Sequence, residues 1–190
     1  MHEVRLLQVP LLFGRAHPHI TLTENGAVAT RNHGGAYRSA ASTVVMRSGH
    51  HFAQFTVLRG VDMMFGVIRP GWDVEGVVNA AVHTDGHCFY DTYSGLRFPG
   101  NKHWEGSQPA KGQRDRIGML LDLDQGIMTV WKNGVRLEVM VAEGLSGPLC
   151  WAVSMYNGTG ARIESAPALA SPTEEELAAA NAWQAARLYG

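Results

Sequence analysis

Single glycines and other turn-forming residues divide this sequence into many short segments that are either apolar or alternate between apolar and polar side chains. The 22 glycines are spread along the chain and are not gathered in one flexible stretch. Short segments bounded in this way are typical of β-strands joined by tight turns. We therefore expect a fold that is mostly β-structure.

Turn dipeptides mark the hairpins. Asn25-Gly26, Asp85-Gly86 and Asn133-Gly134 each follow a segment of strand length. Asn-Gly and Asp-Gly favour type I′ turns, which need positive φ angles and join paired strands. The hairpin strands are expected at 19–23 with 27–31 and at 79–83 with 88–91. A β-meander is expected from 116–123, which turns at Asp124-Gln125-Gly126 into 127–132, after which Asn133-Gly134 turns the chain again. Further strands are expected at 42–46, 52–58, 63–68, 149–155 and 161–165, and a long surface loop at 98–112.

One helix is expected, at the C-terminal end. Ser171-Pro172-Thr173-Glu174 has the pattern of a helix start, with a hydroxyl at the N-cap, proline in the first turn and Glu three residues after the serine. Alanine- and glutamate-rich sequence continues to Arg187, as good helix formers should. The main stripe of this helix consists of Leu177, Ala180, Gln184 and Leu188.

Charge and cysteine content exclude several classes of protein. With 16 basic and 17 acidic side chains, the chain lacks the positive field that gives affinity for nucleic acids or anionic membranes. Only Cys88 and Cys150 are present, so we expect two free thiols and no disulfide framework. The N-terminus lacks the pattern of a signal peptide, and no apolar run approaches the roughly 20 residues that span a bilayer. We expect a cytoplasmic protein, with the nucleus as the alternative.

Several motifs together resemble the signature of SPRY domains. Residues 115–126 (Asp-Arg-Ile-Gly-Met-Leu-Leu-Asp-Leu-Asp-Gln-Gly) lead into Trp131-Lys132-Asn133-Gly134, and residues 144–149 (Gly-Leu-Ser-Gly-Pro-Leu) follow. Upstream, 48–52 (Ser-Gly-His-His-Phe) and Phe65-Gly66-Val67 resemble the family's entry strand and its Gly-Val strand. The likeness covers 43–165. The chain departs from the family's usual residues at Ala53-Gln54, Val130, Val141 and Cys150-Trp151.

The resemblance implies a two-sheet antiparallel β-sandwich of the concanavalin-like type, to which residues 1–165 would belong. Residues 166–190 would form a short tether and a helix packed on the sandwich or on a partner. It also implies a binding module that recognises a peptide or loop of another protein through loops at one end. In the family such modules often deliver substrates to ubiquitin ligases or act as adaptors in signalling complexes. No ligase domain is recognisable here, so that role would need another chain or a larger parent protein.

The segment Arg69-Pro70-Gly71-Trp72-Asp73 is the first candidate for partner binding. It follows an expected strand, matches a partner-binding loop of the family, and contains Arg and Trp, residue types enriched in binding hot spots. The alternative is that Trp72 folds back over the core and Arg69 forms an internal ion pair.

Two further pairs of residues complete the candidate binding site. Tyr156 and Asn157 follow the strand 149–155 and offer an aromatic ring, a hydroxyl and an amide. They correspond to a loop that lines the family's peptide pocket, although a plain turn is the alternative. Tyr37 and Arg38 are candidates for a third wall of the pocket, with an ordinary surface loop as the alternative.

Catalytic, metal and cofactor sites are not expected. His83, Asp85, His87 and Cys88 lie close together in the sequence, but alternation along a strand separates neighbours and no zinc-binding spacing occurs. No Gly-x-Ser-x-Gly elbow or phosphate-binding glycine loop is present. We expect a monomeric binding module that is not an enzyme and carries no cofactor. A glycan-binding lectin of similar shape is the alternative function.

Overall fold

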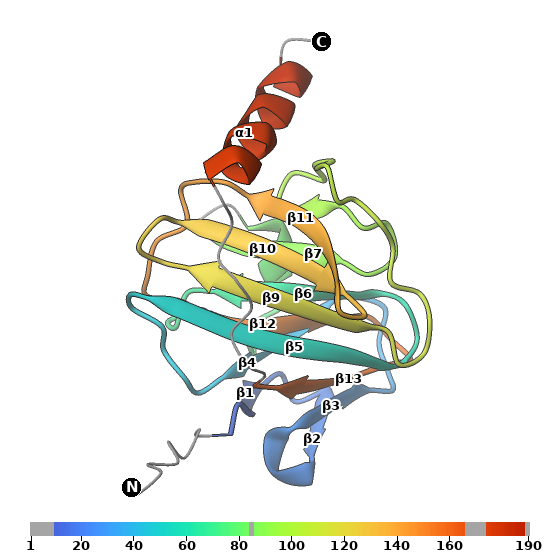
Figure 1. Ribbon diagram of the computed structural model, residues 1–190. Helices are drawn as coiled ribbons and strands as arrows, with labels where there is room; N and C mark the ends of the chain where they lie inside the picture. The colour runs from blue at the N-terminus through green and yellow to red at the C-terminus, as the bar shows by residue number, and fades with distance from the viewer. Residues whose placement is uncertain (1–9, 84–85, 166–173, 189–190) are drawn as a thin grey trace, which may run out of the picture.

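The computed structural model describes residues 10–83, 86–165 and 174–188 and shows two antiparallel sheets that form a sandwich (Figure 1). The six-stranded sheet contains, in spatial order, β1 (Phe13–Ala16), β4 (Arg38–Ser42), β12 (Cys150–Met155), β6 (Met63–Ile68), β7 (Cys88–Asp91) and β8 (Arg97–Phe98). The seven-stranded sheet contains β11 (Val135–Val141), β10 (Ile127–Lys132), β9 (Arg116–Asp122), β5 (His50–Arg59), β13 (Thr159–Glu164), β3 (Val28–Arg31) and β2 (Ile20–Thr23). The predicted fold class is confirmed.

The main core lies between the two sheets. Ala53, Phe55 and Val57 alternate along β5 and are fully buried, as expected for one face of a pleated strand. Phe55 stacks on Phe65 of the opposite sheet, with 4.7 Å between ring centroids and 5° between ring planes. Trp151 of β12 meets Phe55 edge-on. Aromatic contacts therefore link the two sheets at the centre of the sandwich.

A second apolar cluster covers the outer face of the six-stranded sheet, and we call it the outer cluster. From the sheet it contains Ala41, Met64, Ile68, Phe89 and Ala152, and from the long β6–β7 connection it contains Val74, Ala80 and Ala81. Both faces of β6 are covered, and all six of its residues are buried. The β6–β7 connection is thus a layer packed on the sheet, not a free loop.

The predicted strand at 79–83 is wrong. Residues Ala80–Val82 form the short 3-10 helix η2, and the Asn79 side chain accepts a hydrogen bond from the Ala81 N–H group. That local side-chain bond favours a turn over extended backbone. The strand expected at 42–46 also lies earlier in the chain, as β4, and Met46 makes only an isolated bridge to Leu149.

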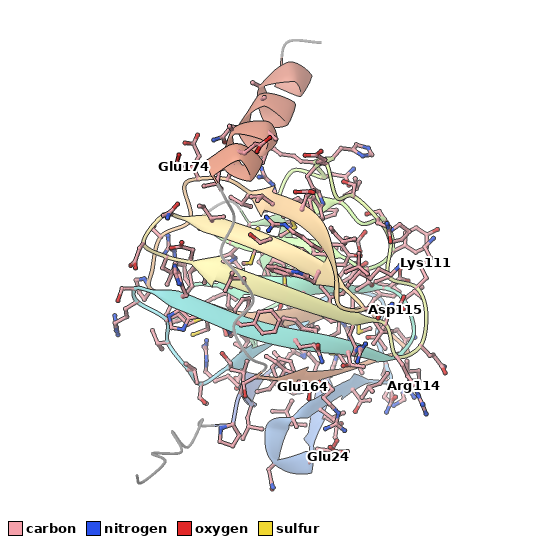
Figure 2. All side chains as sticks on the ribbon, viewed as in Figure 1. Glu24, Lys111, Arg114, Asp115, Glu164 and Glu174 are labelled. Atoms are coloured by element: carbon pink, nitrogen blue, oxygen red, sulfur yellow. The ribbon has the colours of Figure 1, made fainter. Side chains whose placement is uncertain are left out.

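The other hairpins agree with the prediction. Lys132 pairs with Val135, which leaves Asn133 (φ 51°) and Gly134 (φ 81°) as the two turn residues of a type I′ turn. Strands β2 and β3 also pair, although η1 (Glu24–Gly26) forms their connection in place of a two-residue turn. The Glu24 carboxylate, labelled in Figure 2, lies 2.6 Å from the Arg162 guanidinium of β13.

The loop expected at 98–112 is irregular after β8, but part of it is buried. Trp104 is only 2% exposed, and its indole N–H group donates to the Gly95 carbonyl oxygen at 2.8 Å. Ala110 is fully buried in the main core. This loop therefore closes one side of the core while its polar residues remain outside.

Helix α1 (Glu174–Leu188) packs on the sandwich beside β11 and extends beyond it (Figure 1). Ala180 is buried against Ile127, Val139 and Ala142, and Leu177 packs beside them. The capping residues Ser171, Pro172 and Thr173 lie outside the described residues. Among the helices described, none is long and apolar enough to cross a membrane.

Candidate functional site

The candidate binding residues do not lie at one end of the sandwich. Strands β6 and β12 are antiparallel neighbours, with Met63 opposite Met155 and Ile68 opposite Cys150. Arg69 continues from Ile68 and Tyr156 continues from Met155. The two residues consequently lie at opposite ends of this strand pair, about 23 Å apart at the usual rise of about 3.3 Å per residue. The structure therefore divides the candidates into two groups.

Tyr37 and Tyr156 form the centre of the first group. Tyr37 directly precedes β4 and Tyr156 directly follows β12, and these strands pair with Arg38 opposite Met155. The two rings lie 5.3 Å apart between centroids, at 51°. Both side chains are half-buried, and Asn157 beside them is exposed. We call Tyr37, Tyr156 and the residues around them the tyrosine surface.

Arg31 of β3 holds the two loops that carry these tyrosines. Its side chain is 1% exposed, and its Nη1 donates to the Met155 carbonyl oxygen at 2.5 Å. Its Nε donates to the His33 carbonyl oxygen at 3.1 Å. One buried guanidinium thus fixes the end of β12 relative to the segment before β4. Sequence reasoning missed Arg31, because nothing in the strand 27–31 marks its last residue as buried.

The Tyr37 hydroxyl stays protonated at physiological pH. Burial raises the pKa of Tyr37 to about 12, and the nearby carboxylates of Asp62 and Asp91 contribute to the same effect. Its ring also packs on the outer cluster. Tyr37 therefore offers a hydrogen-bond donor on a ring that is already held in place.

Arg38 connects the tyrosine surface to the β6–β7 connection. Its Nη1 donates to the Tyr37 carbonyl oxygen at 2.8 Å and to the Val77 carbonyl oxygen at 3.1 Å. Nearby, the Ser154 hydroxyl donates to the Asn79 side chain at 2.7 Å. These bonds hold Val77 at this end of the sheet, where it is 75% exposed, and Val78 next to it is 54% exposed. From the sequence, these two valines could have been identified as candidates because they form an apolar pair inside a loop.

The second group lies on the outer face and at the opposite end. The Arg69 Nη1 donates to the carbonyl oxygens of Ser146 and Pro148, at 2.6 and 3.2 Å. Trp72 is half-buried on the outer cluster, with its ring centroid 4.5 Å from that of His83 and 4.9 Å from that of His87. The indole thus folds back over the apolar layer, which is the alternative considered from the sequence.

A groove of about 580 Å³ runs beside Trp72, and we call it the edge groove. One wall is Gly14, Arg15 and Ala16 of β1, and the other is residues 71–75. The Arg15 Nη1 donates to the Trp72 carbonyl oxygen at 3.1 Å and joins the two walls. Asp73 is exposed, and its carboxylate accepts a hydrogen bond from the Glu75 N–H group. Pro70 is half-buried and Gly71 is exposed.

The cysteine and histidine side chains do not converge on a metal. Among residues 10–83, 86–165 and 174–188, no group of three or more His, Cys, Asp or Glu could hold an ion; Asp85 lies outside these ranges. Cys88 belongs to the main core and Cys150 pairs with Ile68, whose side chain lies in the outer cluster. Both thiols are free and buried. Burial raises the pKa of Cys88 to about 12 and also raises the pKa of Cys150.

Comparison with known proteins identifies the fold. No family model matches the sequence, and no curated protein matches it significantly. Among solved structures, the SPRY domain of human HERC1 matches with a TM-score of 0.64 and 21% identity over 78% of this chain and 94% of that one. The TRIM65 PSpry domain matches at 0.60 and 16% identity, over 82% and 89%. A stonustoxin structure matches at 0.59 and 14% identity, over 82% of this chain and 27% of that one.

Proposed function

Because the chain has the fold of SPRY domains, we propose that it is a non-catalytic interaction module that binds a peptide or loop of a partner protein at the tyrosine surface. Such a module would act as an adaptor or substrate receptor. The two buried free thiols support a reducing compartment such as the cytoplasm or nucleus.

The contact between Tyr37 and Tyr156 carries this proposal. The two rings come from different loops and meet 5.3 Å apart, and Arg31 fixes both loops from beneath through main-chain carbonyl oxygens. Side chains that are already ordered lose little conformational entropy on binding. Tyrosine offers a large apolar area together with a polar end, which suits it to a binding surface.

The surroundings of the two rings favour a protein partner. Val77 and Val78 are exposed beside Arg38. Removing valine side chains from water is favourable, so a partner that covers them would be stabilised. Exposed Asn157 provides both a donor and an acceptor at the rim. An apolar centre with a polar rim is the usual composition of a protein interface.

The test begins with a native lysate, from which the tagged chain captures partners that are identified by mass spectrometry. Affinity of the purified partner is then measured by calorimetry for the wild type and for Tyr156→Ala and Tyr37→Phe. We expect Tyr156→Ala to weaken binding by about 1–4 kcal/mol, as truncation of a hot spot does. Tyr37→Phe, which keeps the ring, should lose only the free energy of one hydrogen bond.

Val135→Ala is the matched control, because Val135 is 67% exposed at the β10–β11 hairpin of the other sheet. It should leave the affinity unchanged. Melting temperatures of all variants show whether each one remains folded. If Tyr156→Ala and Val135→Ala bind the partner equally well, the tyrosine surface is not the binding site.

A further inference from the structure

Strand β1 lies at the edge of the six-stranded sheet. It pairs with β4 on one side, and no other described strand pairs with it on the second side. The N–H and C=O groups of a strand point alternately to its two sides, so an edge strand presents a row of groups that another chain can pair with. Other β-sheet proteins bind extended peptides by adding them to such an edge.

The edge groove gives β1 a second wall. Residues 71–75 face Gly14, Arg15 and Ala16 across the groove. Gly14 and Gly71 have no side chains and are both exposed, so the backbone is accessible on each wall. The four residues of β1 extend over about 13 Å. A segment of similar length could therefore enter the groove and pair with β1.

The groove presents negative charge. Asp73 and Glu75 are both exposed on the loop wall. Arg15 also lines the groove, but its guanidinium is already engaged with this loop, because its Nη1 donates to the Trp72 carbonyl oxygen and its Nη2 is buried. His17, near Glu75, has a lowered pKa because of burial and then the charge of Arg38, and so adds no positive charge at neutral pH. A lysine or arginine side chain would complement this wall.

We propose that the edge groove is a second docking site, where an extended segment of a partner protein bearing a lysine or arginine adds as a strand to β1. The segment's main chain bonds to β1, and its basic side chain reaches Asp73 and Glu75. This site is separate from the tyrosine surface and uses a different mode of recognition. Side chains on one face of the added strand contact Trp72, because alternate residues of a strand share a face.

The test uses dodecapeptides selected from a random phage library on the wild-type protein. We expect selected peptides in which a basic residue follows alternating β-branched residues, with NMR shift changes at residues 14–16 and 71–75. Neutralising the wall with Asp73→Asn and Glu75→Gln together should weaken binding at least tenfold. Asparagine keeps the side-chain oxygen that accepts the Glu75 N–H bond, so the loop conformation is retained. Glu143→Gln, at another exposed carboxylate, is the matched control.

Methylation of alternate peptide nitrogens tests the main-chain pairing directly. One of the two methylation patterns should abolish binding, since only one set of N–H groups faces β1. The proposal is overturned if both methylated peptides bind as well as the parent, if the neutralised variant binds normally, or if selection yields no peptide. Peptides that lose affinity only in Tyr156→Ala would overturn the edge site while supporting the tyrosine surface, so the two proposals fail separately.

Discussion

Replacing Trp72 by alanine tests whether this indole belongs to the outer cluster or to an exposed binding loop. A fully buried Trp→Ala substitution costs about 3–5 kcal/mol. Trp72 is half-buried, so about half of that cost, roughly 2 kcal/mol, follows from the same principle. In a protein of this size, a loss of 2 kcal/mol should lower the melting temperature by about 4–8 °C. Urea denaturation should show a lower midpoint with an unchanged slope.

Trp72→Phe sharpens the same test. The Trp72 indole N–H group is buried and has no hydrogen-bond partner among the described residues. An unsatisfied buried donor costs about 1–3 kcal/mol, so phenylalanine removes that cost while keeping most of the ring. We expect Trp72→Phe to lose less than half the stability that Trp72→Ala loses.

Tyr93→Ala is the control, because Tyr93 is 53% exposed with the Lys111 ammonium, labelled in Figure 2, 4.0 Å from its ring centroid. Its loss should stay below about 1 kcal/mol, the usual worth of an exposed cation–π contact. If Trp72→Ala costs less than about 0.5 kcal/mol, as surface substitutions do, the indole does not pack on the outer cluster and the argument is wrong.

Three further predictions concern the strands and the thiols. Gly134→Val should destabilise by about 2 kcal/mol in urea melts, because Gly134 has φ +81° with no neighbouring atom within 4 Å and the whole cost is backbone strain; an unchanged midpoint would contradict the type I′ turn. Gly66→Ala should cost about 3 kcal/mol or more, since its Cβ would lie 1.9 Å from the Cys88 carbonyl oxygen; a normal melt would refute the β6–β7 pairing. Cys88 and Cys150 should resist iodoacetamide at about pH 8 in the folded protein, because burial raises the pKa of both thiols. Both should react fully in urea, and finding only one reactive thiol there would show that the two cysteines are not both free.

The sequence predicted the bounds of a strand correctly where an apolar run ends at glycine, proline or an Asn-Gly turn. The strands β6 and β10 match their predicted bounds because Arg69-Pro70-Gly71 and Asn133-Gly134 end them. The segment 79–83 also contains three consecutive apolar residues, but the hydrogen bond that the Asn79 side chain accepts from the Ala81 N–H group favours a turn there. Such a bond is one of several options that the sequence allows. Strand composition alone therefore overpredicts β-structure in a segment that packs as a turn.

The candidate site depended on long-range pairing that a single sequence does not contain. Tyr37 and Tyr156 meet because β4 and β12 are neighbours, and Arg69 lies away from them because β6 runs antiparallel to β12. The resemblance to SPRY domains supplied Tyr156 as a candidate, and Tyr37 was added as a third wall of the same pocket, but neither predicted the division into two surfaces. Arg31 was missed because its burial depends on carbonyl groups far away in the sequence.

The way in which Arg31 holds the tyrosine loops also makes this chain a candidate scaffold for engineered binders. Both acceptors of its guanidinium, at Met155 and His33, are main-chain carbonyl oxygens, which any amino acid provides. The side chains at 33, 35–37 and 156–157 can therefore be randomised without removing the bonds that set the spacing of the two loops, whereas Gly34 and Gly158 stay fixed because both have positive φ and a Cβ on Gly34 would lie 2.8 Å from the Arg31 guanidinium. Antibody variable domains separate framework from variable loops in the same manner. A library built on these two segments would inherit loop geometry from the framework and draw its specificity from the randomised residues.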